Sequence, residues 1–348
     1  MHKHFQQSIM DKLDEITKKF KALNTTQQDL IIKEIEQLVR ASTADVRDKQ
    51  SAHHQSSGPS CPECHSTNFR RNGHQQGQQV YLCKDCGRQY RQSSGTLISW
   101  LKKPELLHTY IRSMLQGNSL RRCAALTDIS LQTSFDWRHK VLTAIGRFNE
   151  EVTFKGIVES DEIFIPYSEK GNKNLARPAR KRGKSLKVKK QRGIGQDQVA
   201  VISTVDRQGN QSFVVATRGR ISKSDIDKAL SGKLAKDVTL CTDSHRSYTA
   251  FSKSNDLNHV KINVSKGQIV KGIYHVQHLN QKASDLKDFI RSFKGVSTKY
   301  LQNYLNWYAI NDKLMKSAVP AIAAMEEAVK SETAWQDFIL IRSGTFVI

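Results

Sequence analysis

Two aspartates and an asparagine are the residues of this chain whose types and placement best suit metal chemistry. Asp161 closes an apolar run that begins at Gly156, and Asp243 closes a second run that begins at Val238. Asn280 opens a later polar segment of helical character. Carboxylate and amide oxygens are ligands that Mg²⁺ accepts. A fold that gathers these three side chains would create a site for a divalent metal.

The segments that must position these residues alternate between strand-like and helical character over residues 152–312. Strands are expected at 156–161, 199–205, 211–216, 238–242 and 259–264, and helices at 224–234, 247–252 and 280–293. This order, with acids ending the first and fourth strands, predicts an α/β fold with an RNase H-like core, a mixed five-stranded sheet with flanking helices. Strand alternation puts Glu159 on the face of Asp161 and turns Glu162 away.

The chemistry that suits this arrangement is phosphoryl transfer on DNA, which uses two divalent ions about 3.5–4 Å apart. We expect Asp161 to bridge Mg²⁺ or Mn²⁺ ions, Asp243 to be a second ligand, and Asn280 to supply a weaker amide ligand. Lys287 follows Asn280 by two helical turns on the same face, where it could hold phosphate. Alternatives stay open: Glu159 as an extra ligand, and His275 or His278 in the third position.

A separate module at 61–95 carries two close cysteine pairs. The four cysteines are Cys61, Cys64, Cys83 and Cys86. This spacing is typical of a zinc ribbon, in which four thiolates surround one Zn²⁺; the alternative is a redox pair or chance. Arg70 and Arg71 lie between the pairs and favour phosphate contact. Cys123 and Cys241 lie in apolar contexts and are expected to be buried thiols.

Helical segments flank this module. Residues 1–40 predict a helical hairpin with Thr25 and Gln28 as a capping box, 41–60 a linker, and 313–348 a C-terminal tail that is partly helical. Residues 104–148 favour a helix-turn-helix-like DNA-binding segment, with Ser119 and Ser130 as helix caps. Its second helix would present Gln132, Thr133 and Arg138 to DNA. The alternative is an ordinary three-helix packing unit.

The formal net charge of +22 and a pI near 9.8 favour a polyanionic partner, and double-stranded DNA fits best. Basic residues concentrate in an insertion at 168–196. Those expected to contact DNA are Arg180, Lys181, Arg182, Lys189 and Lys190; the alternative is a solvated loop. No apolar run is long enough for a membrane span, and paired cysteines fit a reducing compartment, so we expect a cytoplasmic protein at the bacterial nucleoid.

Several of these strings together resemble the IS1595 family of insertion-sequence transposases, with an ISXO2-like transposase domain. The resemblance covers roughly residues 55–312 and rests on CPEC at 61–64, CKDC at 83–86, ESDE at 159–162, TDSHRSY at 242–248, HLNQKASDLK at 278–287 and FKGVSTKYLQNYL at 293–305. It implies a DDE-type transposase that binds the element's terminal inverted repeats, cleaves them and transfers the freed 3′-hydroxyl, as a homo-oligomer in a synaptic complex.

The third catalytic position departs from the usual glutamate, because this chain has Asn280 there. A branch of the family uses asparagine followed by lysine, which fits Asn280 and Lys287. Two alternatives follow from the departure. One is a catalytically inactive zinc-ribbon and helix-turn-helix DNA-binding regulator derived from a transposase, and the other is an RNase H-like nuclease that cuts without strand transfer.

Overall fold

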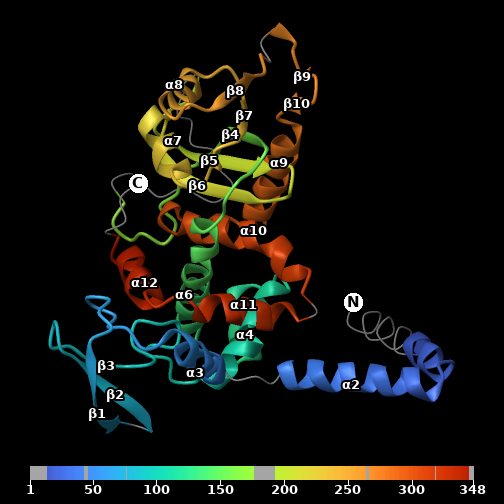
Figure 1. The fold of residues 1–348 in the computed structure, drawn as a ribbon, viewed down its shortest axis with the longest axis vertical. Coiled ribbons are helices and arrows are strands. Elements are labelled where there is room, and N and C mark those ends of the chain that lie inside the picture. The colour runs from blue at the N-terminus through green and yellow to red at the C-terminus, as the bar shows by residue number, and fades with distance from the viewer. Residues whose placement is uncertain are drawn as a thin grey trace.

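The computed structural model describes residues 14–42, 46–75, 77–175, 193–263, 266–317 and 319–344. A sheet flanked by helices forms one end of the molecule, and a body of helices with a small three-stranded ribbon forms the other (Figure 1). The long helix α6 (Leu131–Glu150) runs between the two ends. Among the described residues, no helix has the length and apolar character needed to cross a membrane.

The central sheet has the strand order β6-β5-β4-β7-β8. The strands are β4 (Ile157–Pro166), β5 (Gln198–Asp206), β6 (Gln211–Arg218), β7 (Thr239–Thr242) and β8 (Asn258–Lys261). Strand β5 is antiparallel to both neighbours, whereas β4, β7 and β8 are parallel. This topology confirms the predicted RNase H-like core with a mixed five-stranded sheet.

Helices cover both faces of the sheet, because the side chains of the central strands alternate between two apolar layers. Val158 and Ile202 point into the layer under α7 (Lys223–Leu230) and α8 (Arg246–Ser254). Ile163 and Val201 point into the opposite layer, under α9 (Gln277–Ser292) and α10 (Leu301–Met315). The short turn η3 (Thr298–Tyr300) leads into α10. Strand alternation thus decides which helix each polar residue of β4 meets.

The helical body combines segments from both ends of the chain. It contains η1 (Pro104–Leu106), α4 (Leu107–Leu115), α5 (Leu120–Leu126), α6, α11 (Pro320–Val329) and α12 (Ala334–Ser343). The apolar side chains of these helices share one core with α9, α10 and one face of the sheet. The C-terminal segment is helical in α11, as expected, and α11 and α12 complete this core.

Helix α6 differs from the short second helix of a simple helix-turn-helix unit. The caps are as predicted: Ser119 accepts the backbone N–H of Arg122, and Ser130 accepts that of Thr133. Beyond its first turn, however, α6 packs against α10, α11 and α12. Its apolar residues, such as Val141 and Leu142, are buried, so most of this helix supports the core and its exposed residues lie at its two ends.

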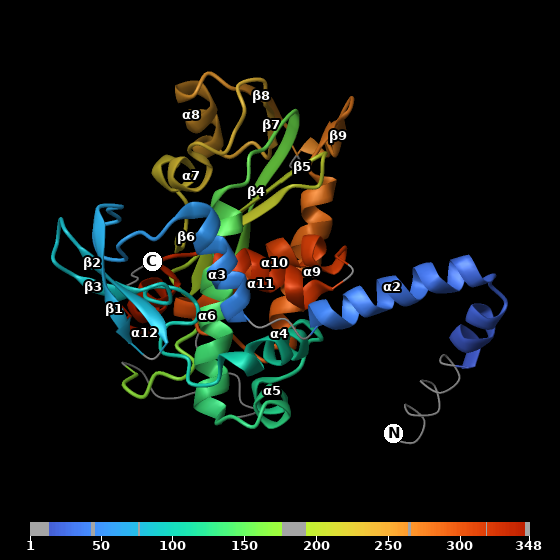
Figure 2. The same cartoon turned by 60° about the horizontal axis from the view of Figure 1, so that its bottom comes forward.

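The N-terminal region also differs from expectation. Residues 14–21 are helical and α2 (Thr25–Ser42) follows, while residues 1–13 of the expected hairpin lie outside the described residues. The reciprocal cap joins Asn24 to Gln27, with the predicted pair shifted by one residue. The predicted linker contains the helix α3 (Val46–Ser57), which packs against α11. Helix α2 extends away from the rest of the molecule in both views (Figures 1 and 2).

Two small β structures complete the description. The strands β1 (Phe69–Gln75), β2 (Gln78–Cys83) and β3 (Gln89–Arg91) form the ribbon of the cysteine module. The strands β9 (Val270–Lys271) and β10 (Tyr274–His275) form a short hairpin immediately before α9. That hairpin brings the chain to the start of the helix that carries Asn280.

Lys140 on α6 gives a testable link between the core and pH. Its amine is buried, donates to the Ser99 carbonyl at 2.5 Å and lies 4.3 Å from the Trp335 ring. Burial lowers its pKa to about 8 from the usual 10.5. The folded state therefore loses this proton before the unfolded state does. Raising the pH from 8 to 10.5 should then stabilise the fold by about 1.4 kcal/mol for each unit of pKa depression.

The measurement compares the free energy of unfolding of the wild type and Lys140→Met across this pH range. The wild type should gain stability relative to the variant as the pH rises, because methionine has no proton to lose. If the difference in free energy of unfolding between the two proteins stays constant from pH 8 to 10.5, the lowered pKa of the buried Lys140 amine is contradicted.

Candidate active site

Asp161 on β4 and Asp243, directly after β7, lie close together. The parallel register pairs Glu159 of β4 with Cys241 of β7, and two residues further along each chain come Asp161 and Asp243. In-register residues of adjacent strands point to the same face of a sheet. Both carboxylates are partly exposed. The fold therefore brings together the two acids that the sequence singled out.

The position of Asp161 within its strand differs from the prediction. Asp161 does not end β4 but lies in its middle, because Ile163 and Ile165 are apolar and keep the strand paired with β5 as far as Pro166. Pairing with β7 stops earlier, since β7 ends at Thr242. One edge of β4 is thus unpaired beside Asp161, where Asp243 and the loop after β7 lie.

The two acids are held by backbone groups on either side of this gap. The Glu162 N–H donates to Asp161 Oδ1 at 2.8 Å, and the His245 N–H donates to Asp243 Oδ1 at 2.8 Å. Burial raises the pKa of Asp161, and the nearby charge of Asp243 raises it further. Like charges placed together resist ionisation. A bound cation would relieve this repulsion, which fits a divalent metal between the two carboxylates.

Glu162 belongs to the same electrostatic group, although strand alternation turns it toward α8. Burial raises its pKa to about 8, and the charges of Asp161 and Asp243 contribute to that shift. Its Oε1 atom is buried without a hydrogen-bond partner among the described residues. The alternation of side chains along the strand correctly predicted which face of the sheet carries Glu162. It did not predict that Glu162 lies near Asp161 and Asp243, because that proximity depends on the gap between β4 and β7.

Helix α9 presents three distinct faces around its axis. One face is buried against the sheet and carries Leu279, Leu286 and Ile290. A second face meets α10, where Lys282 Nζ lies 2.7 Å from Asp312 and the Tyr308 hydroxyl donates to the Lys282 carbonyl. Asn280 and Lys287 are exposed on the remaining flank, as the helical period of 3.6 residues requires.

The flank with Asn280 and Lys287 is turned away from α10. Helix α10 packs on β6, at one edge of the sheet, whereas α9 packs on β5 and β4. The side of α9 that faces away from α10 is therefore the side toward β7, the strand that leads to Asp243. Asn280 and Lys287 thus lie on the correct flank for the predicted site, and their roles remain predictions.

Glu159 lies on the same strand face as Asp161 but is occupied by other groups. It is 1 % exposed, and its carboxylate accepts the backbone N–H of Leu279 and contacts Arg207, His275 and His278. The alternative of Glu159 as an extra magnesium ligand does not fit these contacts. His275 and His278 both contact the Glu159 carboxylate. Arg207, a turn residue, carried no sequence signal for this position.

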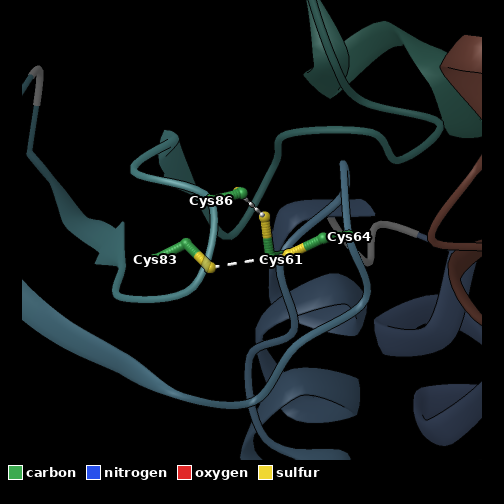
Figure 3. Close-up of side chains that lie close together, drawn as sticks. All are labelled: Cys61, Cys64, Cys83 and Cys86. Carbon is green, nitrogen blue, oxygen red and sulfur yellow. Dashed lines mark hydrogen bonds between the residues drawn. The ribbon is translucent and has the colours of Figure 1, made fainter.

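The four cysteines of the ribbon lie close together in two cross-pairs (Figure 3). Cys61 Sγ is 3.6 Å from Cys86 Sγ, and Cys64 Sγ is 3.6 Å from Cys83 Sγ. All four sulfurs lie within 4.8 Å of one another. Tetrahedral zinc with Zn–S bonds of about 2.3 Å needs sulfurs about 3.8 Å apart. The donor set and spacing therefore fit the predicted Zn²⁺.

Backbone geometry supports the same conclusion. The His65 N–H donates to the Cys61 carbonyl, and the Gly87 N–H donates to the Cys83 carbonyl, which makes two equivalent turns. His65 and Gly87 both have positive φ, at 58° and 73°. The backbone N–H groups of Cys86 and Asp85 lower the pKa of the Cys83 thiol to about 7, against the effect of burial. Burial and the neighbouring thiols instead raise the pKa of Cys64 and Cys86, so Cys83 is the thiol of the group that most readily becomes a thiolate.

The predicted DNA-contacting residues divide into three groups. Arg70 and Arg71 on β1 and Gln132 on α6 are exposed, while Thr133 is partly buried in the α6 cap. Arg138 is 2 % exposed and donates to the Asn118 carbonyl at 2.7 Å, so its predicted DNA contact is wrong and its role is structural. The insertion residues Arg180, Lys181, Arg182, Lys189 and Lys190 lie outside the described residues.

Comparison with known proteins adds an independent line of support. An uncharacterized protein in the transposable element ISH50 of Halobacterium salinarum is 27% identical over 267 residues, which cover 74% of this chain and 87% of that protein. The pre-cleavage Mos1 transpososome is 11% identical over 65% of this chain and 78% of that chain, with a TM-score of 0.22. The mariner Mos1 paired end complex with Mg is 12% identical over 65% and 77%, with a TM-score of 0.26.

The RNase H-like fold follows from the strand order β6-β5-β4-β7-β8 with an antiparallel β5. The family model for the ISXO2-like transposase domain matches residues 153–309, the segment that contains the sheet, Asp161, Asp243 and Asn280. This match indicates an ISXO2-like transposase domain over residues 153–309, and the chain is similar to insertion-sequence transposases of the IS1595 family.

Proposed function

We propose that this protein is an active DNA transposase that binds the terminal inverted repeats of its element, cleaves the DNA and transfers the freed strand. The observation that carries the proposal is that Asp161 and Asp243 each lie two residues beyond the paired residues Glu159 and Cys241, at the unpaired edge of β4. Asn280 and Lys287 are exposed on α9, the helix proposed to supply the remaining groups of the site. The proposal includes metal-dependent polynucleotidyl transfer, with Mg²⁺ or Mn²⁺ as the catalytic ion.

The role of each residue follows from its chemistry and position. Asp161 and Asp243 would hold divalent ions, and the Asn280 amide oxygen would complete the ligand set. When bound, such ions stabilise the charge that develops on the phosphate and activate the attacking oxygen. Lys287, exposed two turns after Asn280, would hold a phosphate of the DNA. Backbone N–H groups fix one oxygen of each aspartate, so the other oxygen can face the ions.

DNA recognition is proposed to rest on surfaces outside the sheet. Arg70 and Arg71 are exposed on the zinc ribbon, and Gln132 is exposed at the start of α6. The net charge of +22 supports strong attraction to DNA phosphates. The need to hold two element ends together supports a homo-oligomer in the synaptic complex.

The decisive test uses a labelled duplex that carries an element end, identified from the inverted repeats that flank the gene. With Mg²⁺ or Mn²⁺, the wild type should cleave the end and join it to target DNA. Asp161→Asn should still bind the end but lose cleavage by roughly 10³-fold, since several kcal/mol of charge stabilisation is lost at a tenfold change per 1.4 kcal/mol.

Asp237→Asn is the matched control, because this exposed aspartate lies at the other end of β7 and loses the same charge. It should keep wild-type cleavage. Full activity in Asp161→Asn would refute the assigned site. A wild type that binds ends tightly but never cleaves them would favour the inactive DNA-binding regulator, and cleavage without joining would favour the nuclease.

A second prediction concerns the zinc ribbon. Cys64→Ser should release zinc and abolish specific end binding while the catalytic domain stays folded, because a module this small depends on its metal for stability. Metal content and gel-shift titration measure the two effects, and circular dichroism checks the fold. Cys123→Ala, which removes a buried thiol outside the ribbon, should change neither zinc nor binding. Retained end recognition in Cys64→Ser would contradict the role of the ribbon.

A further inference from the structure

Helix α9 begins without a cap of its own. Its N-cap residue is Val276, whose side chain offers no acceptor, and its first turn contains no acidic residue. The first N–H groups of a helix need partners from outside the helix. By comparison, α5, α6 and α7 begin at Ser119, Ser130 and Ser222, and each serine accepts a backbone N–H of its own helix. The Gln277 N–H meets His275 Nδ1 at 3.2 Å, so the next N–H groups of the first turn still need an acceptor from another part of the chain.

Glu159 of β4 supplies this missing acceptor. Its Oε2 atom accepts the Leu279 N–H in the first turn of α9 at 3.0 Å, and its Oε1 atom lies 2.8 Å from His278 Nδ1. A carboxylate at this end of a helix also interacts favourably with the helix dipole. Glu159 is buried, so water does not compete strongly for these contacts. The carboxylate thus fixes the start of α9 to the central strand.

Arg207 completes the arrangement from the turn between β5 and β6. Its Nη2 atom lies 3.1 Å from Glu159 Oε1 and donates to the Ile273 carbonyl in the β9–β10 hairpin at 3.3 Å. Its Nη1 atom lies 3.0 Å from His275 Nε2 and 2.5 Å from His278 Nδ1. One guanidinium therefore connects the carboxylate, the hairpin and the first turn of α9.

Glu159, His275 and His278 have a composition that could bind a transition metal, and their ligand atoms lie within 4.8 Å of one another. The Arg207 guanidinium, however, lies against the same carboxylate and imidazole atoms. A metal ion at this position would have to displace the Arg207 guanidinium or would be repelled by its positive charge. The contacts therefore favour a structural clamp over a second metal site.

We propose that Glu159 is a positioning residue for Asn280, which rests on the transposase function proposed above. Asn280 directly follows Leu279, the residue whose N–H Glu159 accepts. Asp161 follows Glu159 by two residues on the same face of β4. The clamp thus fixes the distance and rotation between the helix that carries the amide ligand and the strand that carries the central carboxylate.

The test measures cleavage of a labelled element end by the full-length protein as a function of Mg²⁺ concentration. Glu159→Ala should raise the Mg²⁺ concentration for half-maximal cleavage by roughly 10- to 100-fold, the usual effect of losing a residue that orients a metal ligand. Glu159→Gln should be intermediate, because its amide oxygen can still accept the Leu279 N–H. Binding of the DNA end should stay within about twofold of the wild type, since no DNA contact is removed.

A double mutant tests whether Glu159 acts through Asn280. If it does, adding Glu159→Ala to Asn280→Ala should shift the Mg²⁺ requirement little beyond the effect of Asn280→Ala alone. An equal shift in both backgrounds would overturn the proposal. Glu327→Gln is the matched control, because it removes a partly buried carboxylate with ion pairs to Lys313 and Lys330 in the helical body; it should leave the Mg²⁺ requirement unchanged.

Hydrogen exchange separates this proposal from the transposase function, because it needs no activity. Amides in the first turn of α9 should exchange faster in Glu159→Ala than in the wild type or Glu327→Gln, with Glu159→Gln between them. Unchanged exchange there would overturn the clamp even if cleavage fell. If the wild type shows no cleavage but exchange responds as expected, the clamp stands and the proposed function fails. If Glu159→Ala does not fold, the Gln variant provides both readouts.

Discussion

The crowding of carboxylates at the unpaired edge of β4 is the constraint on which the account of this protein depends. Burial raises the pKa values of Asp161 and Glu162, and the neighbouring carboxylate charges in this group, including Asp243, raise them further. An arrangement of this kind is unfavourable without a cation, so its presence at a partly exposed edge indicates a function that uses one. The end of β7 at Thr242 creates this edge, because it leaves β4 paired on one side only.

The elements around this edge can be understood as its supports. The layer of α7 and α8 and the layer of α9 and α10 hold the strands in register from both faces. Helix α10 fixes the rotation of α9 through Lys282 and Tyr308, which leaves Asn280 and Lys287 on the flank toward β7. The C-terminal helices then join this domain to α6 and, through Gln336 and the Pro62 carbonyl, to the ribbon, so that the proposed metal site and the proposed DNA contacts belong to one connected framework.

Much of this could be predicted from local sequence patterns. Alternating apolar residues predicted the strands, serines predicted the starts of α5 and α6, and cysteine spacing predicted the ribbon. The errors arise where contacts between residues far apart in the sequence determine the position of a side chain or a helix. Arg138 is a residue type that often contacts DNA, yet here it donates a hydrogen bond to the Asn118 carbonyl and is buried in the helical body. The polar segment of α3 resembles a linker because its helix depends on packing against α11. The contact between Glu159 and Leu279 joins residues that no local pattern relates.

Localised cleavage of the protein backbone by bound iron tests the central claim most directly. Fe²⁺ substituted for Mg²⁺ generates oxidants that cut the chain next to its ligands, and mass spectrometry locates the cuts. The account predicts cuts near Asp161, Asp243 and Asn280 that excess Mg²⁺ suppresses and that Asp161→Asn removes together. Cuts that leave the neighbourhood of Asp243 intact, or that persist unchanged in Asp161→Asn, would contradict a shared metal site on β4 and β7.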